Sequence, residues 1–113
     1  MENSILNTVK KAVGIMPDYT VFDDTLIMHI NSVFMTLTQV GVGPKQGFRI
    51  EDETAEWSAF LSDDYENFES VKSYICLKVR LLFDPPSSST HMQCIESQIK
   101  EFEWRLNIEA ESD

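Results

Sequence analysis

The stretch DYENFESVKSYICLKVRLLFDPP, residues 64–86, decides the fold because it predicts one long and mostly buried helix. Asp64 can cap the start of such a helix, whereas Pro85 and Pro86 cannot continue it. At 100° per residue, the apolar side chains cover an arc of roughly 200°, which is much wider than the stripe of a surface helix. A helix of this kind needs neighbours on several sides, so the stretch predicts a bundle. Its apolar side chains are Phe68, Val71, Tyr74, Ile75, Leu77, Val79, Leu81 and Leu82.

Lys78 is the one cation in the centre of that apolar arc. An unpaired ammonium group in a dry core costs several kcal/mol or loses its proton. The stem can instead lie along apolar surface while the amine reaches water. Alternatively, the amine pairs with an acid of a neighbouring helix or of an adjacent subunit. These alternatives stay open, and Lys78 is a candidate contact residue.

Length and composition predict a single soluble domain over residues 1–113. The chain is 42% hydrophobic and 25% charged, as in ordinary globular proteins, and its apolar runs are too short to cross a bilayer. The start of the chain lacks the pattern of a secretory signal, so we expect synthesis in the cytoplasm. The net charge of −10 disfavours nucleic-acid binding, which depends on Lys and Arg. The two cysteines are expected to be free thiols.

Two helices are predicted before the glycine-rich connection. Asn3 or Ser4 can cap a short amphipathic helix that ends at Gly14, and residues 1–16 are expected to form either a packed helix or a mobile N-terminal arm. The second helix spans residues 20–41, with Thr20 and Asp23 spaced as a capping box and Gly41 just after its end. Its expected buried stripe consists of Phe22, Leu26, Ile30, Val33, Phe34 and Leu37.

Met28 and Met35 lie on the opposite side of that second helix, seven residues apart. They are either two partly exposed methionines, which are common on protein surfaces, or a seam for protein contact. We therefore treat both as candidate contact residues.

Residues 48–50, Phe-Arg-Ile, alternate apolar and polar side chains and predict a short β segment in the connecting loop. Asp52 is expected to cap a brief helix that carries Trp57 into the core. A last helix is predicted from a cap at Ser88 or Ser89 to about residue 108, and residues 109–113 are expected to form a flexible acidic tail. The core stripe of the last helix contains Met92, Ile95, Ile99, Phe102 and Leu106.

Trp104 and Ile108 stand well round the last helix from its core stripe. They predict a contact surface or a second packing layer under the N-terminal helix. The alternative is that Trp104 lies flat on its own helix.

No active site is visible in the sequence. A metal needs three or four converging ligands and a nucleophile needs a base, but the chain has two His, two Cys and no HExxH, CxxC or GxSxG pattern. The paired acids lie where helices are predicted to begin, so capping explains them without catalysis. We expect neither enzymatic activity nor a cofactor or metal.

Three segments, in their order and spacing, resemble the head-tail connector (adaptor or head-completion) proteins of long-tailed bacteriophages. They are FDDTLIMHINSVFMTLTQVGVGP, FRIEDETAEWSAFL and VKSYICLKVRLLFDPPSSS, and the resemblance extends to IKEFEWRLN near the end. It implies an all-α helical bundle of about four main helices plus one short helix. It also implies a structural virion protein that forms a ring, commonly of twelve subunits, under the portal protein. That ring would receive a stopper or tail-side completion protein, and DNA would pass through it without sequence-specific binding.

The charge agrees with a conduit, because an acidic lumen repels phosphate and lets DNA move without sticking. The main alternative is a monomeric or dimeric acidic regulatory protein, for example a DNA mimic, which the composition also allows. A hydrolase is the third alternative, but it requires a pocket of converging polar groups that the sequence does not indicate.

Overall fold

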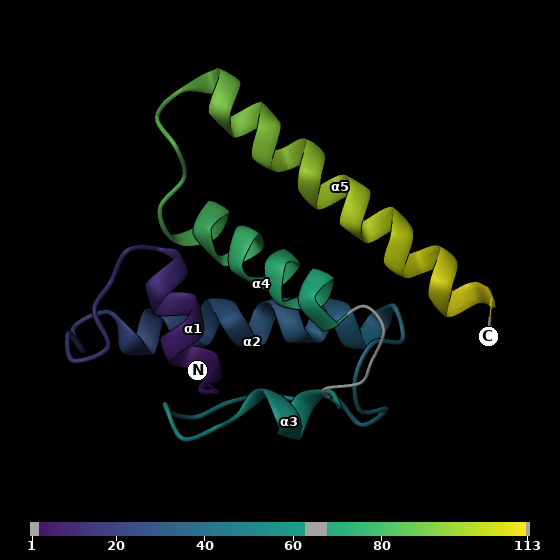
Figure 1. The fold of residues 1–113 in the computed structure, drawn as a ribbon, viewed down its shortest axis with the longest axis horizontal. Coiled ribbons are helices and arrows are strands. Elements are labelled where there is room, and N and C mark those ends of the chain that lie inside the picture. Colours follow the sequence, from purple (N-terminus) through teal and green to yellow (C-terminus); the bar gives the residue numbers. More distant parts are fainter. Residues whose placement is uncertain (1–2, 63–67, 113) are drawn as a thin grey trace.

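The fold is an all-α bundle, as the sequence predicts. The computed structural model describes residues 3–62 and 68–112, with side chains as far as Leu106. Four longer helices and one short helix follow in chain order (Figure 1). The bounds are Ile5–Ala12 for α1, Asp23–Gln39 for α2, Trp57–Phe60 for α3, Phe68–Phe83 for α4 and Ser89–Ser112 for α5.

Helix α4 has neighbours on several sides, as its wide apolar arc predicts. It packs against α2, α1 and α5, and Figure 1 shows it between α2 and α5. Val71, Tyr74, Ile75 and Val79 are buried, whereas Leu82 at the end of the arc is exposed. The helix ends at Phe83, just before Asp84 and the two prolines, as expected. The predicted cap at Asp64 lies outside the described residues.

Helix α1 forms as predicted and packs against both α2 and α4. Ser4 is its N-cap and accepts a hydrogen bond from the backbone N–H of Asn7 at 3.2 Å. Gly14 has a φ of +84° just after the helix. Ile5, Leu6 and Val9 are completely or almost completely buried, so this face of α1 belongs to the core.

Helix α2 ends as predicted but begins differently. After its last turn, the N–H groups of Gly41 and Val42 donate to the carbonyls of Thr38 and Leu37, at 3.1 and 2.9 Å. Gly41 supplies the positive φ that this C-terminal motif needs. The expected Thr20–Asp23 capping box is wrong, because the helix begins at Asp23 without a side-chain cap.

The short β segment expected at residues 48–50 does not form, and the described residues contain no strand beyond an isolated bridge between Ser4 and Glu56. The side chain of Asn31 takes the place of a strand partner. Its amide donates to the Ile50 carbonyl at 3.0 Å and its oxygen accepts from the Ile50 N–H at 2.8 Å. An amide has both a donor and an acceptor, so it satisfies this backbone unit as a neighbouring strand would.

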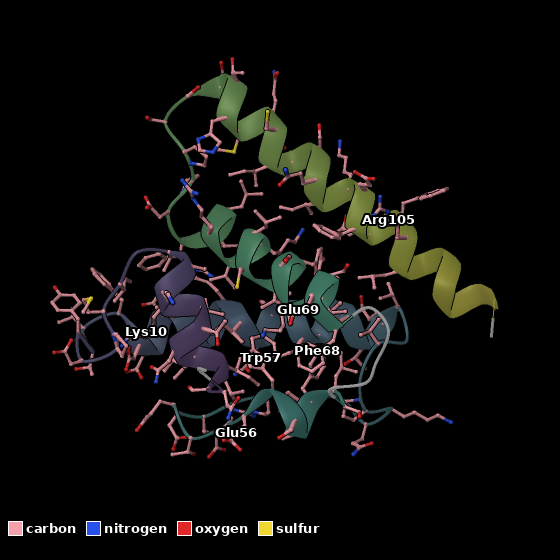
Figure 2. All side chains as sticks on the ribbon, viewed as in Figure 1. Lys10, Glu56, Trp57, Phe68, Glu69 and Arg105 are labelled. Atoms are coloured by element: carbon pink, nitrogen blue, oxygen red, sulfur yellow. The ribbon has the colours of Figure 1, made fainter. Side chains whose placement is uncertain are left out.

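Helix α3 is shorter than expected and places Trp57 in the core, as predicted. Asp52 accepts hydrogen bonds from Thr54 instead of capping the helix. The Trp57 indole donates to the Thr8 hydroxyl at 3.0 Å. Its ring lies 6.4 Å from that of Phe68, and both residues lie between α3 and α4 in Figure 2.

Helix α5 packs on α4 through the predicted stripe. Ser88 accepts from the N–H of His91 at 3.3 Å and so caps the helix. Ile95, Ile99 and Leu106 are buried. The helix continues beyond the expected end near residue 108 to Ser112, because Glu-Ala-Glu contains good helix formers and no breaker.

Candidate protein-contact surfaces

The described residues show no cluster of metal ligands. No group of three or more His, Cys, Asp or Glu among them is placed to hold a metal ion. Burial raises the pKa of the Cys76 thiol to about 11, so this sulfur stays protonated and unreactive near neutral pH. Cys94 is an exposed free thiol. The surfaces that remain to be explained are apolar.

Met28 and Met35 line an open groove along the outer face of α2. Their side chains are 63% and 65% exposed, opposite the buried stripe of the helix. The groove has a volume of about 790 Å³. We call it the methionine groove. Its lining residues are Asp24, Ile27, Met28, Asn31, Ser32, Met35, Thr38, Gln39, Gln46, Gly47, Phe48 and Arg49.

The second wall of the methionine groove is the segment 46–49, which is held in place by contacts on its core side. Asn31 holds the adjacent Ile50 backbone against α2, as described above. Phe48 packs edge-on against Phe34, with ring centroids 5.0 Å apart. Phe34 in turn lies 4.6 Å from the ring of Phe60. The groove is therefore built between rigid elements, and its two methionines are its most adaptable part.

Trp104 lies on the outer face of α5 and is 64% exposed. It is on the opposite side of the helix from Ile95, Ile99 and Leu106, which pack on α4. The expected second packing layer under α1 is therefore wrong for Trp104, since a buried layer would cover the ring. The side chain of Ile108 lies outside the described residues.

Lys78 pairs with an acid of the same chain, which is one of the alternatives left open by the sequence. Its Nζ lies 3.5 Å from Oε2 of Glu103 on α5, and the two side chains are 30% and 36% exposed. The Tyr74 hydroxyl donates to the same oxygen at 2.8 Å. Burial, and then the nearby Glu103 carboxylate, raise the pKa of Tyr74 well above its usual value. The three side chains tie α4 to α5.

An exposed apolar loop between α1 and α2 was not foreseen from the sequence. Its apolar members are Met16, Tyr19, Val21 and Phe22, all exposed. Phe22 was expected in the buried stripe of α2, but it precedes the helix and packs edge-on against Phe83, at 5.4 Å between ring centroids. The signal was present, because the segment MPDYTVF, residues 16–22, is rich in apolar residues and has Pro17 in second position, just after a helix stop. We call residues 16–22 the apolar loop.

Lys10 fixes the apolar loop from inside the fold. Its side chain is 1% exposed and its Nζ lies 2.8 Å from Oδ1 of Asp23 at the start of α2. The same amine donates to the carbonyl of Pro17 at 2.9 Å. Figure 2 shows Lys10 on α1 beside this loop. Among the described residues the buried cation is therefore Lys10, whereas Lys78 is only half-buried.

Residues 5–113 match a family model described as phage connector protein, which covers nearly the whole chain. The chain belongs to the phage connector family. No curated protein and no solved structure matches it. The expected resemblance to phage connectors is confirmed, and the connector family is one of structural proteins.

Connector subunits work with other virion proteins, so exposed apolar side chains on this connector are candidate contacts. None of the described helices is long and apolar enough to span a membrane. The structure presents three such regions on the connector: the methionine groove, the outer face of α5 around Trp104, and the apolar loop.

Proposed function

We propose that this chain is a head-tail connector subunit of the adaptor type, which forms a ring beneath the portal and joins the DNA-filled capsid to the tail. The family match over residues 5–113 carries the proposal. The clustered side chains of the apolar loop support it, because a contiguous exposed apolar patch, unlike single scattered side chains, marks an interaction site. The role requires no catalytic group and no cofactor.

The proposed partners are further copies of the chain, possibly twelve in the ring as the family resemblance implies, the portal protein, and a stopper or tail-side completion protein. DNA passes through the ring and is not read. The net charge of −10 supports a passage of this kind, since acidic walls repel phosphate and do not retain the duplex. We propose that the protein acts in the virion, at the head-tail interface, after synthesis in the host cytoplasm.

We assign different roles to the candidate residues in this assembly. Met28, Met35 and Trp104 make direct contacts with neighbouring proteins, because their side chains extend away from the core. Ile108 follows Trp104 by one turn of α5 and is proposed for the same surface. Lys78 acts indirectly by holding α5 on α4 through Glu103, which keeps Trp104 in place.

Native mass spectrometry of the purified chain, with and without purified portal protein, tests this function. A closed higher-order ring, or a stoichiometric complex with the portal, is the expected result. A chain that stays monomeric in both samples contradicts the connector role. A compact monomer that instead binds a host DNA-binding protein supports the acidic regulatory alternative.

A further inference from the structure

The exposed apolar side chains of the described chain are concentrated at one place. Of eight large exposed hydrophobic residues, five belong to the apolar loop or to the adjoining end of α4. The ring contacts from Tyr19 to Phe22 and from Phe22 to Phe83 connect these two segments, at 5.9 and 5.4 Å. The five exposed residues are Met16, Tyr19, Val21, Phe22 and Leu82. This concentration distinguishes the loop from the single exposed Trp104 on α5.

The apolar loop is also held in one conformation before any partner binds. Lys10 joins it to α1 and α2 through the Pro17 carbonyl and the Asp23 carboxylate. The N–H of Ile15 donates to the Lys10 carbonyl at 2.8 Å, and that of Tyr19 donates to the Met16 carbonyl at 3.1 Å. A loop ordered in advance loses little conformational entropy on binding, so its exposed side chains favour association more effectively.

Two exposed acids adjoin the apolar loop, and the exposed base nearest to it along the chain is Lys11 on α1. Asp18 lies within it and Asp84 follows Phe83, and both side chains are exposed. The cation of Lys10 does not offset them, since it is buried and paired with Asp23. A partner for this surface needs an apolar hollow with a positive rim.

The methionine groove of the same chain has an apolar lining and two bases on or beside its second wall. Arg49 lines it and Lys45 is exposed in the preceding turn. Among the described residues, neither cation has a carboxylate partner. Met28 and Met35 supply the adaptable apolar lining, and Asp24 is the acid at the end of the groove nearest the loop. With 19 acids and 9 bases, identical copies repel unless a contact places bases against acids.

We propose that the apolar loop of one copy docks into the methionine groove of the next copy. The inference rests on the proposed ring and names the surfaces that form it. The loop precedes α2 and the groove follows the outer face of that helix, so the two surfaces are different parts of one subunit. Each copy donates a loop and receives one. Such a head-to-tail contact builds a ring when its rotation closes.

Two double variants test the contact because all four altered side chains are exposed. The loop variant is Tyr19→Ser/Val21→Ser, and the groove variant is Met28→Ser/Met35→Ser. Unchanged thermal unfolding by circular dichroism verifies that each monomer folds. Native mass spectrometry then measures the protein concentration at half-assembly, with portal protein added if the wild-type ring needs it. Each variant should require a concentration at least about tenfold higher than the wild type, since the lost apolar anchors dominate such contacts.

Mixing the two variants gives the decisive result. The loop variant keeps an intact groove and the groove variant keeps an intact loop, so an equimolar mixture should form a 1:1 heterodimer that does not grow. Assembly of either variant at the wild-type concentration overturns the proposal. Loss of assembly without a heterodimer also overturns it, because the groove then receives another partner such as the portal.

A charge variant provides a second readout with a matched control. Asp18→Lys and Glu53→Lys both replace an exposed acid and make the same change in net charge, but Glu53 lies in neither surface. Lower net repulsion alone would strengthen assembly in both. The proposed contact predicts that Asp18→Lys weakens assembly while Glu53→Lys does not, and equal behaviour of the two contradicts it. A wild-type chain that never assembles, even with portal protein, refutes the proposed function itself, whereas normal wild-type rings with unaffected variants refute only this contact.

Discussion

Lys10→Met should be among the most destabilising single substitutions in this protein. Methionine keeps the length and most of the volume of the buried stem but removes the cation. The Asp23 carboxylate then loses the amine that lies 2.8 Å away, and the Pro17 carbonyl loses its donor at 2.9 Å. Folding removes water from both acceptors. Leaving them without a donor therefore costs more stability than the contact contributes when it is present.

The magnitude follows from the burial of the two partners. Breaking a fully buried ion pair costs about 3–5 kcal/mol. The Lys10 side chain is 1% exposed and that of Asp23 is 22% exposed, so the stranded carboxylate can recover part of its hydration. We therefore expect about 3 kcal/mol, the lower end of that range. For a domain of this size, the loss lowers the melting temperature by about 10–15 °C.

Urea unfolding at pH 7, followed by circular dichroism at low protein concentration, measures this loss. Lys11→Met is the matched control, because Lys11 is the neighbouring lysine and is exposed; it should change stability by less than about 0.5 kcal/mol. In a double-mutant cycle with Asp23→Asn, the coupling between the two sites should exceed about 1 kcal/mol. A Lys10→Met protein within 1 kcal/mol of the wild type would refute the buried pair.

Three further predictions concern α4 and α5. Lys78→Met should cost about 0.5–1 kcal/mol in urea unfolding, because its pair with Glu103 is partly solvated. Tyr74→Phe should cost about 1.5–3 kcal/mol, because it removes the hydrogen bond to the same carboxylate. A larger loss for Lys78→Met than for Tyr74→Phe would contradict the geometry. Trp104→Ala should reduce ring formation or portal binding in native mass spectrometry more than it lowers the monomer melting temperature, and unchanged assembly would reject a contact role. Burial raises the pKa of Cys76 to about 11, so folding disfavours its thiolate. The effect of this thiol on the free energy of unfolding is constant below about pH 9. As the pH rises from 9 to 11, the free energy of unfolding should fall by roughly 2 kcal/mol, because the unfolded chain releases the proton first. Cys76→Ala should lose correspondingly less stability than the wild type between pH 9 and 11, and parallel losses would show that the thiol is not buried.

The bundle could be predicted from the sequence because its signals are local. The caps at Ser4 and Ser88, the glycine after α2 and the prolines after α4 each act within a few residues of the helix end they define. The wide apolar arc of α4 also indicated correctly that several helices surround it. These features depend on spacing along the chain and not on the final packing.

Two of the errors occurred where a side chain bonds with a distant partner. Asp23 was expected to serve the α2 capping box, but it lies against Lys10, thirteen positions earlier in the chain. Residues 48–50 have the alternation of a strand, but the amide of Asn31 takes the strand partner's place at Ile50. A one-dimensional pattern does not include such bonds, since they depend on which segments tertiary packing brings together.

The candidate surfaces were only partly predictable for the same reason. Met28, Met35 and Trp104 lie opposite apolar stripes, and a helix period is sufficient to indicate their exposure. The apolar loop has no period, so its exposure follows only from the fold. Lys10 did give a signal, because it follows Leu6 by four residues and therefore borders the buried stripe of α1.

The buried Lys10–Asp23 pair is explained better by the loop that it fixes than by the stability that it provides. Two well-packed apolar side chains often stabilise a protein as well as a buried ion pair, or better. Apolar side chains, however, cannot donate to the Pro17 carbonyl, which holds the loop between α1 and α2. A single amine binds that carbonyl and the first residue of α2 together, and so sets both where α2 begins and where the exposed side chains of residues 16–22 lie. In the proposed ring, each subunit presents this loop to its neighbour. A cation at position 10 holds the loop in place for that contact, whereas an apolar residue does not.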